Sequence, residues 1–343
     1  MGENYQGDGI PVFLINGFLE SGKTSFIQYT MNQEYFQTNG NTLLLLCEEG
    51  EKEYDPIELA KLHTTPIYMS DITDFQEEKL RKLADTYKPE RILIEWNGMW
   101  NQDDLYGGPM SEAVLSEQQN REPKYTVSMP KEWFLYQVIT IVDGSTLKMY
   151  LSNMRSFLGQ MLRNAELCIV NRCDNLSNEE MIDYRRKLRA MGQNAMIMLE
   201  DKNGEIPQSA LPEELPYALN QEKIAIADTD YGTWFLDCMD NPERYLGKEL
   251  SFTAMVLKRK NMPADEFIPG RMAMTCCAQD MSFLGFICKG NKDMLSAFST
   301  RDWVKVTVKV ALEEREEYHG VGPVLKLVDI VRTGEISEPV NFQ

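Results

Sequence analysis

Short apolar runs alternate with amphipathic stretches along the first two hundred residues of the chain. The apolar runs predict buried strands at residues 10–16, 41–49, 91–96, 138–145, 165–174 and 195–201. The amphipathic stretches predict helices that begin near residue 25, at Asp74 as a cap, and at residue 178 with a stop at Gly192. Because the strands are apolar throughout and are separated by helices, we expect an α/β fold with a mainly parallel sheet covered on both faces.

The pattern changes beyond residue 245, where short β-like runs follow one another with few helical stretches. These runs cover residues 249–258, 270–277, 283–290, 302–314 and 324–334. Within the fourth run, every second residue is valine: Val304, Val306, Val308 and Val310. A period of two with one apolar face indicates a half-buried strand. We therefore expect a small β-barrel, with the oligonucleotide-binding (OB) type as one candidate.

These two patterns predict two domains joined by a linker. Residues 1–204 form the expected α/β domain, and residues 245–343 form the β-rich domain. The intervening residues 205–244 begin with a stretch that carries three prolines and little periodicity, which is typical of a connecting segment.

Residues 17–24 read GFLESGKT, a complete G-x-x-x-x-G-K-T pattern between an expected strand and an expected helix. This context predicts a P-loop, in which backbone N–H groups and the helix dipole bind nucleotide phosphates. We expect Lys23 to reach the terminal phosphates and the Thr24 hydroxyl to bind Mg²⁺. The residues expected around the phosphates are Gly17, Glu20, Ser21, Gly22, Lys23, Thr24 and Ser25.

Two later segments stand where a phosphate site needs carboxylates. An acidic loop, CEEGEKEYD at residues 47–55, follows the second expected strand, and we expect Glu48 to contribute to Mg²⁺ binding. The strand ILIEW ends in Glu95, expected beside Mg²⁺, and Gly98 is placed to sense the γ-phosphate. Residues 97–130 have weak periodicity and form either a lid or partner-binding segment or a passive surface excursion.

Residues 171–174 read NRCD and resemble the guanine-reading N-K-x-D loop. We expect Asp174 to accept hydrogen bonds from guanine, Asn171 to tie the loop to the P-loop, and the stem of Arg172 to pack on the base. Because adenine lacks the matching pair of donors, the pattern favours GTP over ATP.

The charge balance narrows the set of partners. The chain has 53 acidic and 35 basic residues and a net charge of −18, which argues against nucleic acid and anionic membranes as general partners. No stretch approaches about 18 apolar residues, so no membrane insertion is expected. Seven cysteines without a recognisable secretion signal predict a reducing compartment, with the cytoplasm as the default location.

These motifs together resemble the CobW-type GTPases, relatives of the nickel-insertion GTPases of urease and hydrogenase. The resemblance covers about residues 10–199 and includes GFLESGKTS, CEEGEKEYD, the Glu95-x-x-Gly98 spacing, IVDG at residues 141–144 and the NRCD loop. It implies a slow, Mg²⁺-dependent GTPase switch in metal handling, in which Lys23, Thr24 and Glu95 are catalytic. The implied partners are a client metalloprotein or a metal transporter, with a homo-oligomer as a further expectation.

One departure from the family concerns its metal site. The family often carries C-x-C-C after the acidic loop, whereas residues 58–70 contain no cysteine. A second candidate lies in RMAMTCCAQD, which resembles a β-rich domain that accompanies predicted bacterial permeases. We consider Cys276 and Cys277 as ligands of Zn²⁺ or another transition metal, and small residues filling the barrel as the alternative.

Three functional hypotheses remain open at this stage. The first is a GTP-hydrolysing switch coupled to metal delivery, in the manner of a metallochaperone. The second is a GTP-gated regulatory or scaffold protein without metal cargo, which the missing C-x-C-C favours. The third is an ATP-using P-loop enzyme.

Overall fold

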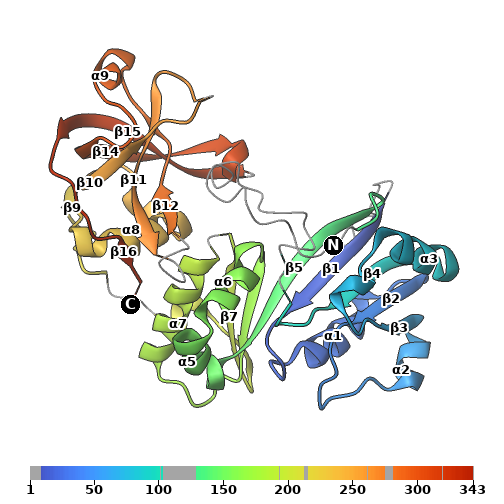
Figure 1. The fold of residues 1–343 in the computed structure, drawn as a ribbon. Helices are drawn as coiled ribbons and strands as arrows, with labels where there is room; N and C mark the ends of the chain where they lie inside the picture. The colour runs from blue at the N-terminus through green and yellow to red at the C-terminus, as the bar shows by residue number, and fades with distance from the viewer. Residues whose placement is uncertain are drawn as a thin grey trace. The chain divides into compact units, whose positions relative to one another are not determined.

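The computed structural model describes residues 9–100, 102, 129–192, 194–211, 215–260, 262–274, 281–318 and 320–342. The chain divides into two compact units, Met1–Leu211 (unit 1) and Pro212–Gln343 (unit 2) (Figure 1). Most of the insertion at residues 97–130 lies outside the described residues, so its role stays a prediction.

Unit 1 is built on one sheet with the strand order β3-β2-β4-β1-β5-β6-β7-β8. Its strands are β1 (Ile10–Asn16), β2 (Asn41–Leu46), β3 (Thr64–Tyr68), β4 (Pro89–Glu95), β5 (Trp133–Asp143), β6 (Leu167–Asn171), β7 (Met196–Asp201) and β8 (Gly204–Ile206). The described strands pair in parallel, except that β8 runs antiparallel to β7. The predicted mainly parallel sheet is confirmed.

Helices cover both faces of this sheet. They are α1 (Lys23–Met31), α2 (Pro56–Lys61), α3 (Glu77–Tyr87), α5 (Gly144–Asn153), α6 (Arg155–Arg163) and α7 (Asn178–Met191). Successive strand residues point to opposite faces, so Leu14 packs in the same cluster as Leu80 of α3. Its neighbour Ile15 packs in the cluster that holds Ile27 of α1. This two-sided burial explains why the strands are apolar throughout.

The boundaries of two helices can be compared with the capping and stop residues predicted from the sequence. Helix α7 begins at Asn178 and ends before Gly192, as predicted, and the structure adds a capping box between Ser177 and Glu180 at its start. Helix α3 begins later than predicted, with Gln76 as its N-cap, so the assignment of Asp74 as the cap is wrong. The carboxylate of Asp74 instead accepts a hydrogen bond of 3.2 Å from the Asp71 N–H within a short 3₁₀ turn.

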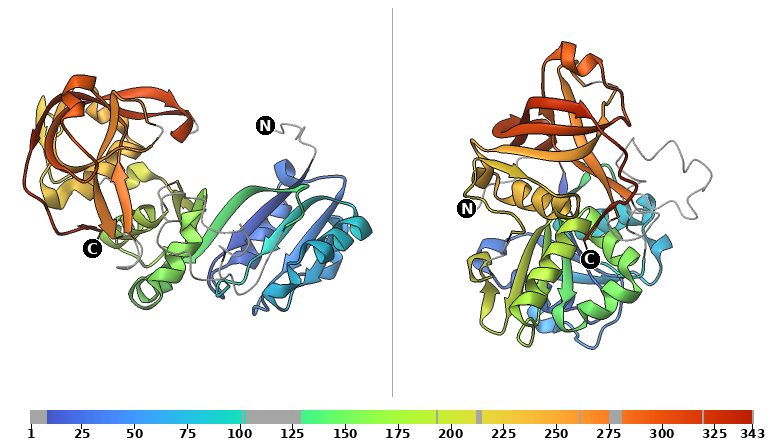
Figure 2. Two further views of the ribbon diagram at one scale, coloured as in Figure 1. Left: turned by 45° about the horizontal axis from the view of Figure 1, so that its top comes forward. Right: turned by 90° about the vertical axis from the view of Figure 1, so that its left-hand side faces the viewer.

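Unit 2 is a β-barrel. Its strands are β9 (Lys223–Ala225), β10 (Glu249–Leu257), β11 (Glu266–Met274), β12 (Met281–Gly285), β13 (Cys288–Lys289), β14 (Trp303–Arg315), β15 (Gly320–Arg332) and β16 (Val340–Asn341). Pairings run from β10 to β11, β13, β15, β14 and back to β10, which closes a ring (Figure 2). Closure leaves these strands without a free edge and confirms the predicted small barrel.

The valine alternation in β14 accounts for one wall of the barrel core. Val304, Val306 and Val308 are fully buried, while Lys305 and Lys309 are exposed. A second contribution comes from helix α8 (Tyr231–Asp240), which lies within the segment expected as a linker. Most of its apolar side chains, including Trp234, are buried, so this part of residues 205–244 belongs to the folded core of unit 2.

The first prediction concerns the anchor of that core. Trp234 is fully buried and its ring lies 4.6 Å from Phe252 and 5.7 Å from Phe286, measured between ring centroids. Replacing a buried tryptophan by alanine removes its packing and leaves a cavity, at a cost of about 3–5 kcal/mol. We expect Trp234→Ala to accelerate amide hydrogen exchange in β10 and β14 by about 100-fold or more.

The matched control is Val331→Ala on β15, where the side chain is 50% exposed. Surface substitutions of this kind change stability by less than about 0.5 kcal/mol, so exchange in the same peptides should change less than about threefold. Equal exchange rates in the Trp234→Ala and Val331→Ala variants would show that Trp234 does not anchor the barrel.

Candidate functional site

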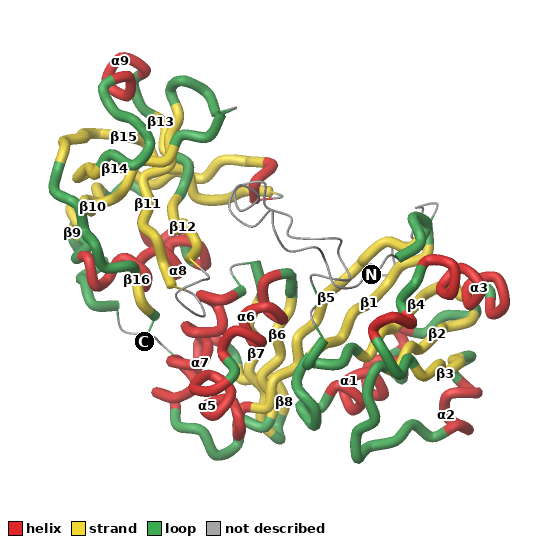
Figure 3. Tube along the Cα trace, viewed as in Figure 1, coloured by secondary structure: helices red, strands yellow, loops and turns green. Residues whose placement is uncertain are grey.

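The predicted site segments meet at one edge of the sheet in unit 1. Because β1, β2, β4, β5 and β6 are parallel, the loops after them emerge at the same edge (Figure 3). The register pairs Ile15 of β1 and Leu46 of β2 with Glu95 of β4. It also pairs Asp143 of β5 with Asn171 of β6. Ligands of open parallel sheets bind at this carboxyl edge.

The loop after β1 has the backbone conformation that only glycine adopts easily. Gly17 has φ +147° and Gly22 has φ +104°, in the region that disfavours side chains. A Cβ at Gly17 would lie 2.3 Å from the Ile141 carbonyl oxygen, so the loop packs tightly on β5. Ser21 Oγ is buried without a hydrogen-bond partner among the described residues. A buried polar atom of this kind at a helix N-terminus suits a loop that binds an anion.

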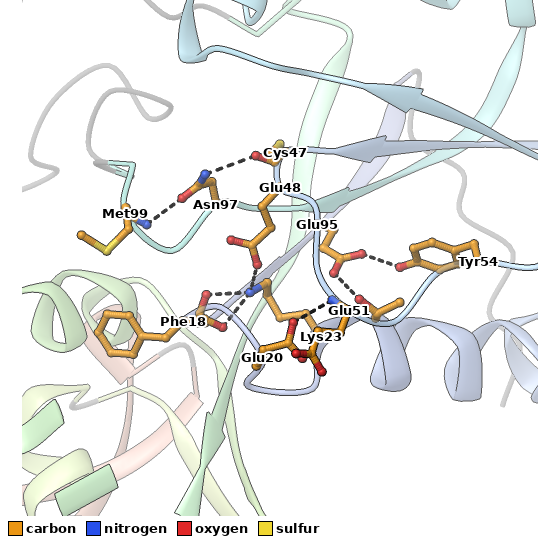
Figure 4. A network of polar contacts seen from close by, with 12 residues as sticks. Phe18, Glu20, Lys23, Cys47, Glu48, Glu51, Tyr54, Glu95, Asn97 and Met99 are labelled. Atoms are coloured by element: carbon orange, nitrogen blue, oxygen red, sulfur yellow. Dashed lines mark hydrogen bonds and ion pairs between the residues drawn. The ribbon is translucent and has the colours of Figure 1, made fainter. Parts of the chain in front are cut away.

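The Lys23 side chain is buried and fully paired (Figure 4). Its ammonium group donates hydrogen bonds of 2.8 Å to both the Gly17 and Phe18 carbonyl oxygens. It also forms an ion pair with the Glu48 carboxylate, whose side chain is 11% exposed. These three partners satisfy the three donors of the ammonium group.

Thr24 and Glu95 lie side by side as predicted. The Thr24 hydroxyl donates a hydrogen bond of 2.6 Å to Glu95 Oε1, and the Tyr54 hydroxyl donates one of 2.5 Å to Glu95 Oε2. Burial raises the pKa of Glu95, and these two hydrogen bonds offset part of that shift. Burial and the nearby Glu95 also raise the pKa of Tyr54, which keeps its phenol protonated as a donor.

The acidic segment, residues 47–55, lies on the P-loop. Glu20 has φ +60°, an unfavourable conformation for a residue with a side chain, and its Oε1 accepts a 2.8 Å hydrogen bond from the Glu51 N–H. The Lys52 ammonium donates a 3.0 Å hydrogen bond to the Ser25 hydroxyl. Asp55 caps helix α2 by accepting from the Ile57 N–H at 2.8 Å.

The chain after Glu95 passes close to the P-loop. A Cβ at Gly98 would lie 2.3 Å from the Gly17 carbonyl oxygen, so this approach requires glycine. The Asn97 amide donates a 3.3 Å hydrogen bond to the Cys47 carbonyl oxygen and accepts one of 2.9 Å from the Met99 N–H. The segment that carries Gly98 is therefore linked to both the P-loop and the acidic segment.

The loop after β6 is joined to the P-loop by two hydrogen bonds. The Asn171 amide donates to the Ser21 carbonyl oxygen at 2.8 Å, and the Arg172 guanidinium donates to the Glu20 carbonyl oxygen at 3.0 Å. Asp174 Oδ1 accepts a 3.0 Å hydrogen bond from the Lys202 N–H. This geometry is the tie between the NRCD loop and the P-loop expected for Asn171.

Asp143, at the end of β5, holds the Arg172 guanidinium in an ion pair. Burial alone would raise the pKa of Asp143, but hydrogen bonds from Ser145 and Arg172 outweigh it and leave this pKa below its usual value. Asp143 therefore stays ionised at neutral pH and fixes the Arg172 head group next to the P-loop.

The structure brings most of the predicted residues together and adds three more. Tyr54, Asp143 and Lys202 were not predicted, although Asp143 lies within the IVDG run and Tyr54 within the acidic segment. Glu48, expected near Mg²⁺, has Lys23 as its recorded ionic partner. Its predicted role toward Mg²⁺ stays a prediction.

The predicted metal ligands Cys276 and Cys277 lie outside the described residues. The cysteines within the described part are buried, and they are Cys47, Cys168, Cys173, Cys238 and Cys288. Burial raises the pKa of each of their thiols, to about 11 for Cys173. Among the described residues, no three or more His, Cys, Asp or Glu side chains gather where they could hold a metal ion. The same residues include no helix with the length and hydropathy needed to cross a membrane.

The mainly parallel sheet and the loop at Gly17–Thr24 define a P-loop nucleotide-binding domain. The family model "CobW/HypB/UreG, nucleotide-binding domain" matches residues 11–198, and the chain belongs to this family. The model "DUF1980 C-terminal domain" matches residues 203–342. No curated protein matches the chain.

Solved structures with some similarity include the hydrogenase maturation factor HypB of Archaeoglobus fulgidus. It is 13% identical, with a TM-score of 0.35, over 58% of this chain and 84% of that one. HypB of Helicobacter pylori in complex with nickel is 11% identical, with a TM-score of 0.32, over 60% and 83%. The single-stranded DNA-binding protein Rim1 of S. cerevisiae mitochondria is 14% identical, with a TM-score of 0.17, over 25% and 97%.

The second prediction tests the close approach of Gly98 to the P-loop. Gly98→Ala places a methyl group 2.3 Å from the Gly17 carbonyl oxygen, so one of the two segments must move. Overpacking of this kind costs about 1–3 kcal/mol, and we expect nucleotide affinity to fall by about 5- to 150-fold. Isothermal titration calorimetry with Mg²⁺ and nucleotide measures this change.

Gly334→Ala is the matched control, since a Cβ there meets nothing within 4 Å. It should leave both the affinity and the thermal unfolding of the protein unchanged. If Gly98→Ala binds nucleotide as tightly as Gly334→Ala, the close packing of Gly98 on the P-loop has no part in binding.

Proposed function

We propose that this protein is a GTP-binding switch that hydrolyses GTP slowly with Mg²⁺. The observation that carries the proposal is the pair of hydrogen bonds between the NRCD loop and the P-loop, from Asn171 to Ser21 and from Arg172 to Glu20. They join a segment suited to a base with a segment suited to phosphates, so one nucleotide can contact both.

Guanine recognition rests on Asp174. Among the described residues, the Lys202 N–H bonds to Oδ1 of this exposed carboxylate, which leaves Oδ2 and a second lone pair of Oδ1 as acceptors. Guanine offers a ring N–H and an exocyclic amine as adjacent donors, whereas adenine does not. The aliphatic stem of Arg172, held through its head group by Asp143, supplies a surface for the base.

Thr24 and Glu95 are the residues that would hold Mg²⁺. Their oxygen atoms lie 2.6 Å apart, and hydroxyl and carboxylate oxygens are ligands that this ion prefers. When bound, Mg²⁺ neutralises charge on the transferring phosphoryl group. Tyr54 holds the second oxygen of Glu95 and, as a protonated phenol, orients that carboxylate rather than removing a proton.

Positioning by the P-loop supplies the rest of the catalysis. Lys23 and the backbone N–H groups after Gly17 would bind the terminal phosphates, and the N–H of Gly98 would contact the γ-phosphate. Because such sites work by electrostatic stabilisation with little other chemistry, we expect slow intrinsic turnover. The acidic segment and the segment at Gly98 are the two parts that would change on hydrolysis.

The coupling to metal ions is the second part of the proposal. The family to which the chain belongs includes HypB, and the Helicobacter pylori HypB structure contains nickel. We propose that the switch controls delivery of a transition metal to a client metalloprotein or transporter, with Cys276 and Cys277 as ligands. A cargo-free scaffold is the alternative that the missing C-x-C-C of residues 58–70 supports.

The third prediction tests guanine recognition. Asp174→Asn keeps an oxygen for the Lys202 N–H but turns an amide donor toward the base. Guanine then loses its acceptor, while xanthine, which has a carbonyl in place of the exocyclic amine, gains a donor. We expect GTP affinity to fall by at least about 100-fold, with XTP binding more tightly than GTP.

Competition binding of GTP, ATP and XTP to both proteins measures this exchange of preference. Asn175→Ala, next to Asp174 and exposed, is the control and should keep the GTP preference. A wild-type protein that turns over ATP as fast as GTP, and an Asp174→Asn variant with unchanged preference, would support the ATP-using enzyme instead.

The fourth prediction tests metal cargo. We expect the reduced protein to bind Ni²⁺, Co²⁺ or Zn²⁺ in the submicromolar range and to lose this binding when Cys276→Ser and Cys277→Ser are combined. Cys238→Ser is the control, because that thiol is buried in unit 2 and its pKa is raised by burial. Absence of metal binding to the wild type, with and without GTP, would leave a cargo-free switch.

A further inference from the structure

The acidic segment contacts the P-loop and its catalytic neighbours at several points (Figure 4). These contacts are Glu48 with Lys23, the Glu51 N–H with Glu20, Lys52 with Ser25, and Tyr54 with Glu95. The groups that would bind a Mg²⁺–nucleotide complex are thus the same groups that hold this segment in place.

The hydrogen-bonding capacity of Lys23 determines which of these contacts must break when a phosphate binds. Its three donors are used by the Gly17 and Phe18 carbonyl oxygens and by Glu48. The two carbonyl groups are part of the P-loop backbone, whose curled conformation they help to maintain. The Glu48 carboxylate is a side chain on a separate segment, so it is the partner that a phosphate oxygen can replace.

Electrostatics favours replacement over sharing. A phosphate oxygen on Lys23 would lie beside the Glu48 carboxylate, and two like charges at one cation destabilise each other. The repulsion between Glu48 and the phosphates increases with the negative charge placed next to Lys23. A triphosphate brings its γ-phosphate there in addition to the β-phosphate, whereas a diphosphate brings the β-phosphate alone.

We propose that Glu48 is a specificity-determining residue that competes with the γ-phosphate for Lys23 and so biases the site toward diphosphate. Binding of a triphosphate displaces Glu48 and releases the acidic segment from the P-loop. This inference rests on the proposed nucleotide function, and it adds the element that distinguishes the triphosphate from the diphosphate.

Glu20 is the tether in this arrangement. A residue with a side chain at φ +60° is conformationally unfavourable, and such positions persist where the surrounding structure uses them. Here the Glu20 carboxylate accepts the Glu51 N–H at 2.8 Å and lies near Gly50, where a Cβ would be 3.2 Å from its Oε1. This contact keeps the acidic segment, and with it Glu48, close to Lys23.

The test compares triphosphate and diphosphate affinity in the full chain. Isothermal titration calorimetry with Mg²⁺ uses GDP and the non-hydrolysable β,γ-imido analogue of GTP. Glu48→Gln keeps the shape of the side chain and removes its charge. We expect the ratio of triphosphate to diphosphate affinity to rise by about tenfold, since a state that competes with binding no longer forms.

Two further variants separate the Glu48 contact from general charge. Glu49→Gln removes an equal charge from the exposed neighbouring residue and should leave the ratio within about twofold of the wild type. Glu20→Gly relieves the unfavourable backbone conformation and removes the tether while Glu48 remains. It should shift the ratio in the same direction as Glu48→Gln, by a smaller factor.

The outcomes distinguish this proposal from the function on which it rests. If the wild type and all variants bind neither nucleotide, the proposed nucleotide function fails, and the role of Glu48 fails with it. If all proteins bind but Glu48→Gln and Glu49→Gln give the same ratio, the role of Glu48 is overturned while the nucleotide function stands.

Discussion

The buried ammonium group of Lys23 is the constraint on which the arrangement of the site depends. A charge with only 3% of its residue surface exposed must be paired, because removing it from water without partners is very unfavourable. Two of its partners are P-loop carbonyl groups, and the hydrogen bonds to them hold the loop in its curled conformation. The third, Glu48, belongs to the loop after β2 and draws that segment onto the P-loop. One side chain thus couples loops that the sequence separates.

The parallel sheet makes this coupling possible. Pairing of β1 with β4 and of β4 with β2 places Glu95 beside the P-loop and beside the start of the acidic segment. Glu95 then receives one hydrogen bond from each side, from Thr24 and from Tyr54. In the proposed function, the end of β4 is therefore the point where a change at the phosphates would reach the acidic segment, through the two oxygens of one carboxylate.

Local sequence signals predicted the elements that depend on local chemistry. The P-loop, the strand before it and the end of α7 before Gly192 depend on residues a few positions apart, and each was predicted correctly. The predicted start of α3 was wrong because the Asp74 carboxylate can either cap a helix or accept a hydrogen bond within a turn. In the structure it accepts from Asp71 within a 3₁₀ turn, and α3 begins later. Tyr54 could not be predicted as a partner of Glu95, because their contact depends on the strand order of the sheet.

The same reasoning explains why helix α8 was missed within the expected linker. Its helical pattern covers only ten residues, Tyr231–Asp240, which is a short signal. The three prolines that precede it are the stronger local signal, and they indicate a connecting segment. Trp234 is buried against Phe252 of β10 and against Phe286, which directly follows β12, and both lie later in the chain, so only the tertiary fold reveals this packing.

In the proposed switch, the surplus of carboxylates around the P-loop would make phosphate binding depend on a cation. Glu20 lies within the P-loop and Glu48 and Glu95 lie beside it, and burial already raises the pKa of Glu95. Phosphates alone would be repelled by this set. Phosphates that arrive with Mg²⁺ would instead find oxygen ligands at Thr24 and Glu95 and a lysine released from Glu48. On this proposal the site would favour a metal-bound nucleotide over a bare one, and the acidic segment, whose charges oppose the phosphates, would be the part that moves.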